Sequence, residues 1–325
     1  MKTAPISAHD HIKENNRKTW FLILVFPLSF ILYIFAIYFA YCTFDGDTQA
    51  LSTATQGTLF AAAPVLAIIS IWLPIAYFWG NKMMLKMAKA TQIQSTDPKY
   101  KKVFQSVENI ALAAGLPTPE VYVINSTGLN AFATGRDPKT ASIALTAGII
   151  EALDQQELEG VIAHEMAHIK NRDVRLMMLI ITGIGVLSFL ASMLFLMGRS
   201  SLRRASFSRN KKDRETAMGT AAICFVSATV LMIFNVCIAP IIHMAISRTQ
   251  EYTADSTGAL LTRNPAGLSS ALRKISTNSA VETLAGQKNM ALACIAPPLI
   301  GKSFFTNIFS THPPIEERIK KLQKM

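Results

Sequence analysis

Charged residues are scarce in this chain of 325 residues. They make up 16% of the sequence, whereas hydrophobic residues make up 50%. Soluble proteins carry roughly 25% charged residues on average. The scarcity argues against an ordinary soluble protein and points to a membrane protein. The length leaves room for one or two domains.

Cysteine is rare as well, with four residues in the whole chain. Cys42, Cys224 and Cys237 lie in or at apolar segments, and Cys294 stands alone. The sequence has no C-x-x-C pair and no regular spacing, so we expect neither a disulfide framework nor a thiolate zinc site. We interpret all four as buried free thiols.

The chain contains four long apolar stretches. They cover residues 20–42, about 58–79, 176–197 and about 217–247. Each meets or exceeds the roughly 20 residues that cross a bilayer as a helix. A polar tail precedes the first stretch, which is too long for a cleavable signal peptide. The pattern therefore predicts multi-pass transmembrane helices.

Basic residues beside these stretches indicate the orientation, because cytoplasmic loops carry an excess of lysine and arginine. The N-terminal tail and residues 81–102 are rich in lysine, whereas the connection 43–57 holds only acidic charges. This predicts a cytoplasmic N-terminus and a cytoplasmic region from residue 81 onward. The basic loop 198–216 conflicts with the rule. Either the third and fourth stretches cross fully and the loop is exported, or they pack as a hydrophobic hairpin without crossing.

The net charge of +11 raises the question of a nucleic-acid partner. The basic residues cluster beside the apolar stretches, where attraction to anionic lipid headgroups explains them. They are not accompanied by a recognition motif of a nucleic-acid-binding module. We expect the lipid bilayer as a partner and no nucleic acid.

The segment 161–168 carries the most specific motif, with His164, Glu165 and His168 in the spacing H-E-x-x-H. Positions i and i+4 share one face of a helix, so both imidazoles can reach one metal ion. Glu165 then lies beside the metal, where it can take a proton from water. The motif predicts the core of a zinc peptidase. The alternative is a helix that carries two histidines by coincidence.

The region around this motif is expected to be α+β, with a few strands followed by helices. Gly115 is a good residue to end a helix, and Asp154 with Glu157 three residues later is a good helix start. The expected elements are a helix at 102–114, strands at 121–124, 129–135 and 141–145, a short helix at 147–152 and a helix at 155–171 that carries the motif.

A catalytic zinc keeps three protein ligands and one open position. The histidines His9, His11 and His243 lie in the N-terminal tail or in an apolar stretch, so a carboxylate is expected as the third ligand. Glu251 is the best candidate. Asp255 lies on the same helix face, where it could accept a hydrogen bond from the outer N–H of His164. A surface pair of acidic residues is the alternative.

Four segments together resemble a known family. They are 164–168 (HEMAH), 251–255 (EYTAD), 130–135 (NAFATG) and 310–318 (STHPPIEER). In this order they resemble the HtpX-type membrane zinc metalloproteases, a family that also contains the CAAX prenyl proteases. The resemblance covers nearly the whole chain. One departure is Thr249–Gln250, where related sequences often carry a basic residue before the glutamate.

The resemblance implies a fold and site residues. The implied fold is an α+β zincin-like (gluzincin) peptidase domain with a small β-sheet, combined with multi-pass transmembrane helices. Glu251 would be the third zinc ligand and Asp255 a partner of the metal-binding histidines. The edge formed by Asn130, Ala131, Phe132 and Ala133 would bind an extended substrate. His312 and Arg318 would lie near the active site and stabilise the oxyanion; otherwise His312 ends a loop and Arg318 pairs with a helix carboxylate.

The expected domain organisation follows the apolar stretches. Residues 1–80 would form an N-terminal tail and two transmembrane helices, and 81–175 the first part of the peptidase domain with the zinc helix. Residues 176–247 would form a hydrophobic helical hairpin with the basic loop 198–216. Residues 248–325 would complete the peptidase domain.

The expected function is that of a membrane-bound zinc endopeptidase with one Zn²⁺ per chain. It would lie in a bacterial cytoplasmic (inner) membrane with its catalytic region facing the cytoplasm, and Glu165 would act as general base and acid. The resemblance implies quality control under stress, with misfolded or damaged proteins, including membrane proteins, as substrates. A scaffold with structural zinc and a prenyl-peptide protease are the alternatives. The intact Glu165 argues against the former and the four apolar stretches against the latter.

Overall fold

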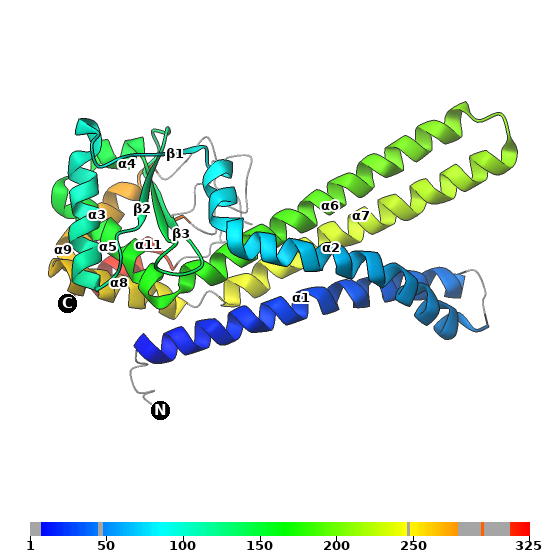
Figure 1. The fold of residues 1–325 in the computed structure, drawn as a ribbon, viewed down its shortest axis with the longest axis horizontal. Coiled ribbons are helices and arrows are strands. Elements are labelled where there is room, and N and C mark those ends of the chain that lie inside the picture. Colours follow the sequence, from blue (N-terminus) through cyan, green and yellow to red (C-terminus); the bar gives the residue numbers. More distant parts are fainter. Residues whose placement is uncertain (1–7, 45–47, 246–247, 279–293, 296–312) are drawn as a thin grey trace. The chain divides into compact units, whose positions relative to one another are not determined.

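The computed structural model describes residues 8–44, 48–245, 248–278, 294–295 and 313–325. The chain divides into two compact units. The first comprises Met1–Thr19, Ile75–Thr182 and Ile242–Met325, and the second comprises Trp20–Pro74 and Gly183–Ile241. Each unit is therefore assembled from segments that lie far apart in the sequence (Figure 1).

A small mixed sheet lies in the first unit. Its strands are β1 (Ala90–Gln92), β2 (Glu120–Ile124), β3 (Ala131–Thr134) and β4 (Ser142–Thr146), in the order β1-β2-β4-β3. β2 and β4 run parallel, and both outer pairs are antiparallel. In this order β2 and β4 are the inner strands and β3 is an edge strand. All five residues of β4 are buried.

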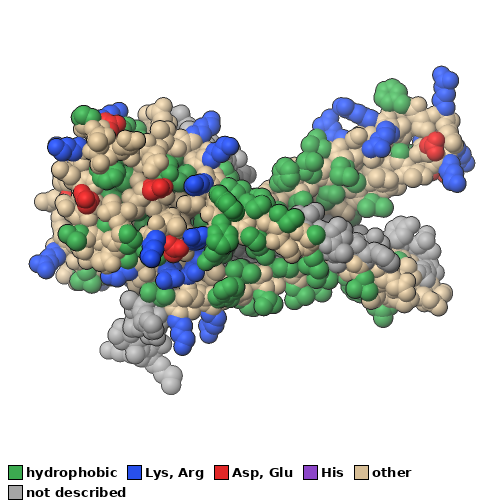
Figure 2. All heavy atoms as spheres, viewed as in Figure 1, with side chains coloured by type: hydrophobic (Ala, Val, Ile, Leu, Met, Phe, Trp, Pro, Cys, Tyr) green, Lys and Arg blue, Asp and Glu red, His purple; other side chains and the backbone are tan. Residues whose placement is uncertain are grey.

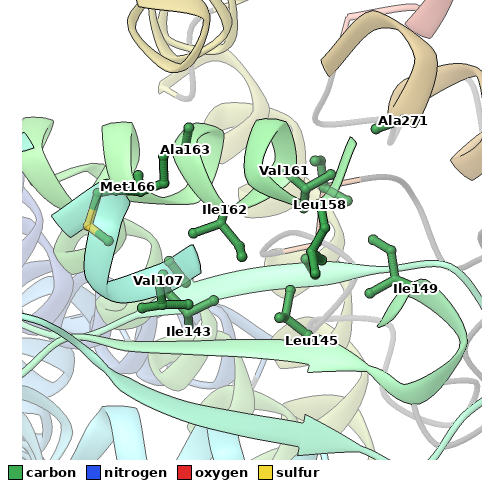
Figure 3. Packing of buried hydrophobic residues seen from close by; sticks show 14 of the residues in the cluster. Val107, Ile143, Leu145, Ile149, Leu158, Val161, Ile162, Ala163, Met166 and Ala271 are labelled. Atoms are coloured by element: carbon green, nitrogen blue, oxygen red, sulfur yellow. The ribbon is translucent and has the colours of Figure 1, made fainter. Parts of the chain in front are cut away.

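Helices supply the rest of the first unit's core. Ile143 and Leu145 of β4 face Leu158 and Ile162 of helix α5 (Gln155–Asn171) in the same cluster of buried side chains (Figure 3). Other helices of the unit are α3 (Lys101–Ala114), α4 (Ala147–Ala152), α8 (Arg248–Thr262), α9 (Pro265–Ile275) and α11 (Ile315–Leu322), with a short 3₁₀ turn η1 (Pro98–Tyr100) ahead of α3.

Helix α5 (Gln155–Asn171) forms because its ends are well capped. The Asp154 side chain accepts from the Glu157 N–H, and the Glu157 carboxylate accepts from the Asp154 N–H. This capping box satisfies two backbone donors that a helix start otherwise leaves without partners. At the other end Arg172 adopts a left-handed conformation with φ 61° and ends the helix. The sequence predicted both limits of this helix.

The close approach of α8 to α5 depends on a glycine. A Cβ added to Gly258 of α8 would lie 3.0 Å from the backbone nitrogen of His164. Glycine lets the two backbones pack this tightly without the close contact that a Cβ would make. The contact matters because α5 and α8 carry the residues of the candidate metal site.

Over the described residues, the predicted apolar stretches lie in four long helices: α1 (Ala8–Phe44), α2 (Ala50–Met87), α6 (Asp173–Phe207) and α7 (Lys211–Ala245). Among the described residues, α6 and the segment Lys211–Asn235 of α7 are long and apolar enough to cross a membrane, with mean hydropathies of 2.4 and 2.1. Within the second unit α6 and α7 meet through Leu187, Ala191 and Leu231.

The second unit exposes many large apolar side chains. Leu24, Leu59 and Phe189 are 72%, 69% and 62% exposed, and hydrophobic side chains gather over the long helices (Figure 2). Monomeric soluble proteins rarely expose apolar surface on this scale, whereas a membrane-facing surface requires it. The three described cysteines, Cys42, Cys224 and Cys294, are buried thiols that form no disulfide among the described residues.

Candidate metal centre

Three candidate ligands converge between α5 and α8. The Nε2 atoms of His164 and His168 lie 3.2 Å apart. Glu251 approaches them from α8, with one oxygen 3.8 Å from His164 Nε2 and the other 3.6 Å from His168 Nε2. His164 and Glu251 are 0% and 2% exposed. Buried imidazole nitrogens and carboxylate oxygens that converge on one point are typical of a metal site. They are not typical of the exposed face of a surface helix.

The dimensions of this group fit one metal ion. The ligand atoms of His164, His168 and Glu251 all lie within 4.8 Å of one another. Tetrahedral coordination with bonds of roughly 2.0–2.2 Å separates its ligand atoms by about 3.3–3.5 Å. The observed separations are close to this range. Two imidazole nitrogens and a carboxylate oxygen also match a set that a catalytic zinc uses.

Each imidazole is held at its outer nitrogen by an aspartate. His164 Nδ1 lies 3.0 Å from Asp255 Oδ1, and His168 Nδ1 lies 2.9 Å from Asp173 Oδ2. A carboxylate at Nδ1 keeps the proton on that nitrogen and leaves the Nε2 lone pair for a metal. The sequence pointed to Asp255 but not to Asp173. The signal that could have indicated Asp173 is its position, five residues after His168 and two residues after the end of α5.

Arg318 of α11 is the largest fully buried side chain near this site, at 0% exposed. Its Nε and Nη2 donate to the two oxygens of Asp255 at 2.9 and 2.7 Å. Its Nη1 also lies 3.4 Å from Glu251 Oε2. The structure thus brings Arg318 to a helix carboxylate, one of the two roles that the sequence left open.

The charges of the site shift two pKa values. Burial alone would raise the pKa of Asp255, but the charge of Arg318 and the hydrogen bonds from His164 and Arg318 lower it to about 2. Burial would lower the pKa of His168, but the hydrogen bond to Asp173 and the charges of Glu251, Asp173 and Glu165 raise it to about 9. The carboxylates therefore create a negative field at the imidazoles, which favours a bound cation.

A small pocket opens beside the candidate ligands. Its lining includes Glu165 and His168 from α5, Glu251 from α8 and Ala133 from β3. Glu165 is 3% exposed and reaches this pocket next to the two histidines. The pocket leaves open space beside both the candidate ligands and the Glu165 carboxylate.

Most of the segment expected to bind substrate lies on edge strand β3, and Asn130 directly precedes this strand. Asn130 is 2% exposed, and its side-chain oxygen accepts from the Ala131 N–H at 3.0 Å. Phe132 is 1% exposed and belongs to the protein interior. The carbonyl of Ala131 already accepts from the Ile295 N–H at 2.9 Å. Ala133 is the residue of the segment that lines the pocket.

The remaining histidines of the sequence lie wholly, or with their side chains, outside the described part of the chain. His312 lies outside the described residues. The side chains of His9, His11 and His243 lie outside the described part as well.

Two imidazoles and a carboxylate around one point, with a glutamate beside them, form a group that could hold a metal ion, and such a group is typical of metal-dependent hydrolases. The sequence profile of peptidase family M48 matches residues 95–325. The chain belongs to this family and is a membrane metallopeptidase, as the sequence predicted.

Two curated relatives, both proteases by name, agree with this assignment. A protease HtpX homolog of Dictyoglomus thermophilum is 35% identical over 322 residues, which are 99% of this chain and 96% of the relative. A protease HtpX homolog of Caldanaerobacter subterraneus is 37% identical over 315 residues, 96% of each chain. The crystal structure of S. mikatae Ste24p is similar with a TM-score of 0.47 and 20% identity, covering 94% of this chain and 66% of that protein.

Proposed function

We propose that this chain is a zinc-dependent endopeptidase that hydrolyses polypeptides at the surface of a bacterial cytoplasmic membrane. The observation that carries the proposal is the convergence of His164, His168 and Glu251 beside a pocket that Glu165 also lines. A structural zinc site normally closes with four protein ligands. A triad next to a buried glutamate and a pocket favours catalysis.

The chemistry divides between the metal and the protein. His164, His168 and Glu251 would hold Zn²⁺, which supplies Lewis acidity to a water molecule and to the scissile carbonyl. Glu165 takes the proton from the attacking water and later delivers it to the leaving amine. Asp255 and Asp173 hold the two imidazoles in the orientation that directs Nε2 to the metal position.

We further propose that an extended substrate pairs with β3 at Ala133. In an antiparallel strand the backbone groups of alternate residues point to the same side. The Ala131 carbonyl bonds to Ile295 rather than to β4, so the backbone groups of Ala133 point to the same outer side. Ala133 also lines the pocket next to Glu165. Main-chain pairing there would position a peptide irrespective of its side chains.

Arg318 fits a supporting role better than contact with the substrate. Its Nε and Nη2 donate to Asp255, and Nη2 also lies 3.3 Å from both ring nitrogens of His164. Its Nη1 lies 3.4 Å from Glu251 Oε2 and 3.3 Å from the Ile295 carbonyl. The guanidinium would act on the metal site through the two carboxylates. His312 remains our candidate for stabilising the oxyanion.

The surrounding architecture is proposed as a gluzincin-type peptidase domain with multi-pass transmembrane helices. Residues 1–80 would carry the first two spans and 81–175 the zinc helix. The hairpin 176–247 would follow, and 248–325 would complete the domain, with the catalytic region in the cytoplasm. Exposed Ser206 in the basic loop provides a test. A cysteine placed there in intact cells should react with an impermeant thiol reagent only if the hairpin crosses the membrane.

We propose misfolded or damaged proteins, including membrane proteins, as physiological substrates. Purified protein should cleave casein, and a chelator should abolish the cleavage. A prenylated peptide, offered in parallel with and without chelator, tests the alternative of prenyl-peptide processing. Cleavage of the prenylated peptide with no activity on casein would contradict the proposal, and so would casein cleavage that survives complete metal removal.

A further inference from the structure

A cluster of buried polar residues lies behind the candidate metal site. It brings together Asn15 of α1, Asn171 at the end of α5, Asp173 at the start of α6 and Gln250 of α8. Asn15 is 1% exposed, Asn171 4% and Gln250 6%. Buried polar side chains are costly unless their hydrogen bonds are made. The partners of Asn15 therefore indicate what it does.

The Asn15 side-chain amide uses both of its N–H groups and its oxygen in hydrogen bonds. Its nitrogen donates to the Asn171 carbonyl at 3.0 Å and to Asp173 Oδ1 at 2.5 Å. Its oxygen accepts from Gln250 Nε2 at 2.6 Å. An amide has two N–H donors and one carbonyl. If the amide were rotated by 180°, its NH₂ would face the NH₂ of Gln250, and its oxygen would face the Asp173 carboxylate. Both contacts would be repulsive, so the three partners fix one orientation of the Asn15 amide.

Through these bonds Asn15 fixes the orientation of Asp173, and Asp173 in turn contacts a histidine of the metal site. Asp173 has one oxygen bonded to Asn15 and the other 2.9 Å from His168 Nδ1. With Oδ1 held by Asn15, the carboxylate plane is fixed and Oδ2 is aimed at the imidazole. The ring of His168 is then fixed from its outer nitrogen, and Nε2 faces His164 and Glu251.

We propose that Asn15 is a positioning residue of the metal site, which holds Asp173 and through it the ring of His168. The N-terminal helix would thereby complete the site from 153 residues upstream in sequence, the separation of Asn15 and His168. Gln250 contributes to the same hydrogen-bonded cluster, because it fixes the orientation of the Asn15 amide and directly precedes Glu251. The inference rests on the proposed metal site.

The test is an isosteric substitution in the full-length protein in detergent. Asn15→Asp keeps the shape of the side chain but replaces its NH₂ with an oxygen that repels Asp173. Asn16→Asp is the matched control, because the Asn16 oxygen accepts from Arg175 and a carboxylate keeps that bond. The readouts are the affinity for Zn²⁺, measured by competition with a chromophoric chelator, and the visible absorption spectrum of bound Co²⁺.

We expect Asn15→Asp to bind Zn²⁺ about 10-fold more weakly, at the low end of the effect of disturbing the partners of a metal-binding histidine. Its Co²⁺ spectrum should change, and Asn16→Asp should match the wild type in both measurements. In the double variant Asn15→Asp/Asp173→Asn, the amide at position 173 can donate to the carboxylate at position 15. This double variant should therefore recover part of the affinity for Zn²⁺.

The outcomes separate the inference from the proposed function. A wild type that binds no zinc through His164, His168 and Glu251 overturns both. A wild type that binds zinc while Asn15→Asp keeps its affinity and Co²⁺ spectrum overturns only the positioning role. An equal loss in Asn16→Asp would also overturn it, because the effect would then come from docking of the helix. If Asn15→Asp does not fold, Asn15→Ala removes the amide without adding charge and must show the same weakening.

Discussion

Arg318 and Asp255 form a bidentate ion pair in the interior of the protein, between the last helix of the described chain and α8. The guanidinium is 0% exposed and donates to both carboxylate oxygens, at 2.9 and 2.7 Å. The pair ties the C-terminal helix to the aspartate that supports His164. Bidentate geometry matters here, because two parallel bonds fix the carboxylate plane as well as its position.

Removing Arg318 should destabilise the fold and the metal site together. Arg318→Ala leaves Asp255 as a buried charge with much weaker compensation, which costs about 3–5 kcal/mol when one partner of a buried pair is lost. Thermal unfolding of the metal-free protein would measure the loss. Arg318→Lys keeps the charge but not the two parallel bonds, so we expect an intermediate unfolding temperature. Equal unfolding temperatures for Arg318→Ala and the wild type would show that the pair is energetically neutral.

Glu165→Gln should abolish hydrolysis and leave metal binding intact. The amide fills the same space but cannot take a proton from water, and loss of a general base typically lowers the rate about 10²–10⁴-fold. Casein cleavage and zinc content of the same preparation are the measurements. Wild-type cleavage by this variant would assign the proton transfer to another group.

Glu251→Ala should instead lose the metal. Removing one of three protein ligands leaves two imidazoles, which are insufficient for a catalytic zinc. Zinc content after dialysis against a weak chelator is the measurement. Glu108→Ala is a suitable control, because Glu108 is an exposed glutamate on α3. Undiminished zinc in Glu251→Ala would remove Glu251 from the ligand set.

The elements that the sequence predicted well are those with local signals. Helix α5 has the expected limits, because its capping box and its residue periodicity are properties of neighbouring residues. Helix α3 ends at Gly115, which adopts φ 69° and closes the helix with its own N–H. By contrast, strand β1 was missed. Its residues Ala90–Gln92 contain no apolar alternation, and it exists because it pairs with β2.

The candidate site was predictable in part for the same reason. His164 and His168 share a helix, so their spacing alone placed them together. Asp173 and Asn15 were not predicted, since their roles come from contacts between segments that the sequence keeps apart. Asn15 meets Asp173 across 158 residues. A local pattern carries no information about such a contact.

Acid should weaken the start of α5 through Glu157. Burial raises the pKa of this carboxyl, but Lys274 and Ser270, both at 2.6 Å, and the N–H of Asp154 lower it below the ordinary value of 4.5. A lowered folded-state pKa contributes stability above pH 4.5 that is lost as the pH falls through the folded value. Unfolding temperatures measured from pH 6 downward should therefore fall less steeply for Glu157→Gln than for the wild type. Exposed Glu108→Gln should follow the wild type, and identical slopes for all three proteins would refute the assignment.

Gly258→Ala should separate the two helices that carry the metal site. The new Cβ would lie 3.0 Å from the His164 backbone nitrogen and 3.2 Å from its Cα. Backbone atoms cannot rotate away, so α8 must move from α5 and take Glu251 with it. Forcing an extra methyl into a packed interior costs about 1–3 kcal/mol. We expect both a lower unfolding temperature and weaker zinc binding, with zinc affinity measured by chelator competition.

Gly219→Ala is the matched control, because this helical glycine has no neighbour within 4 Å of an added Cβ, and alanine there should stabilise the helix by about 0.5–1 kcal/mol. If Gly258→Ala bound zinc as tightly as Gly219→Ala, close packing of α5 and α8 would not be what positions Glu251.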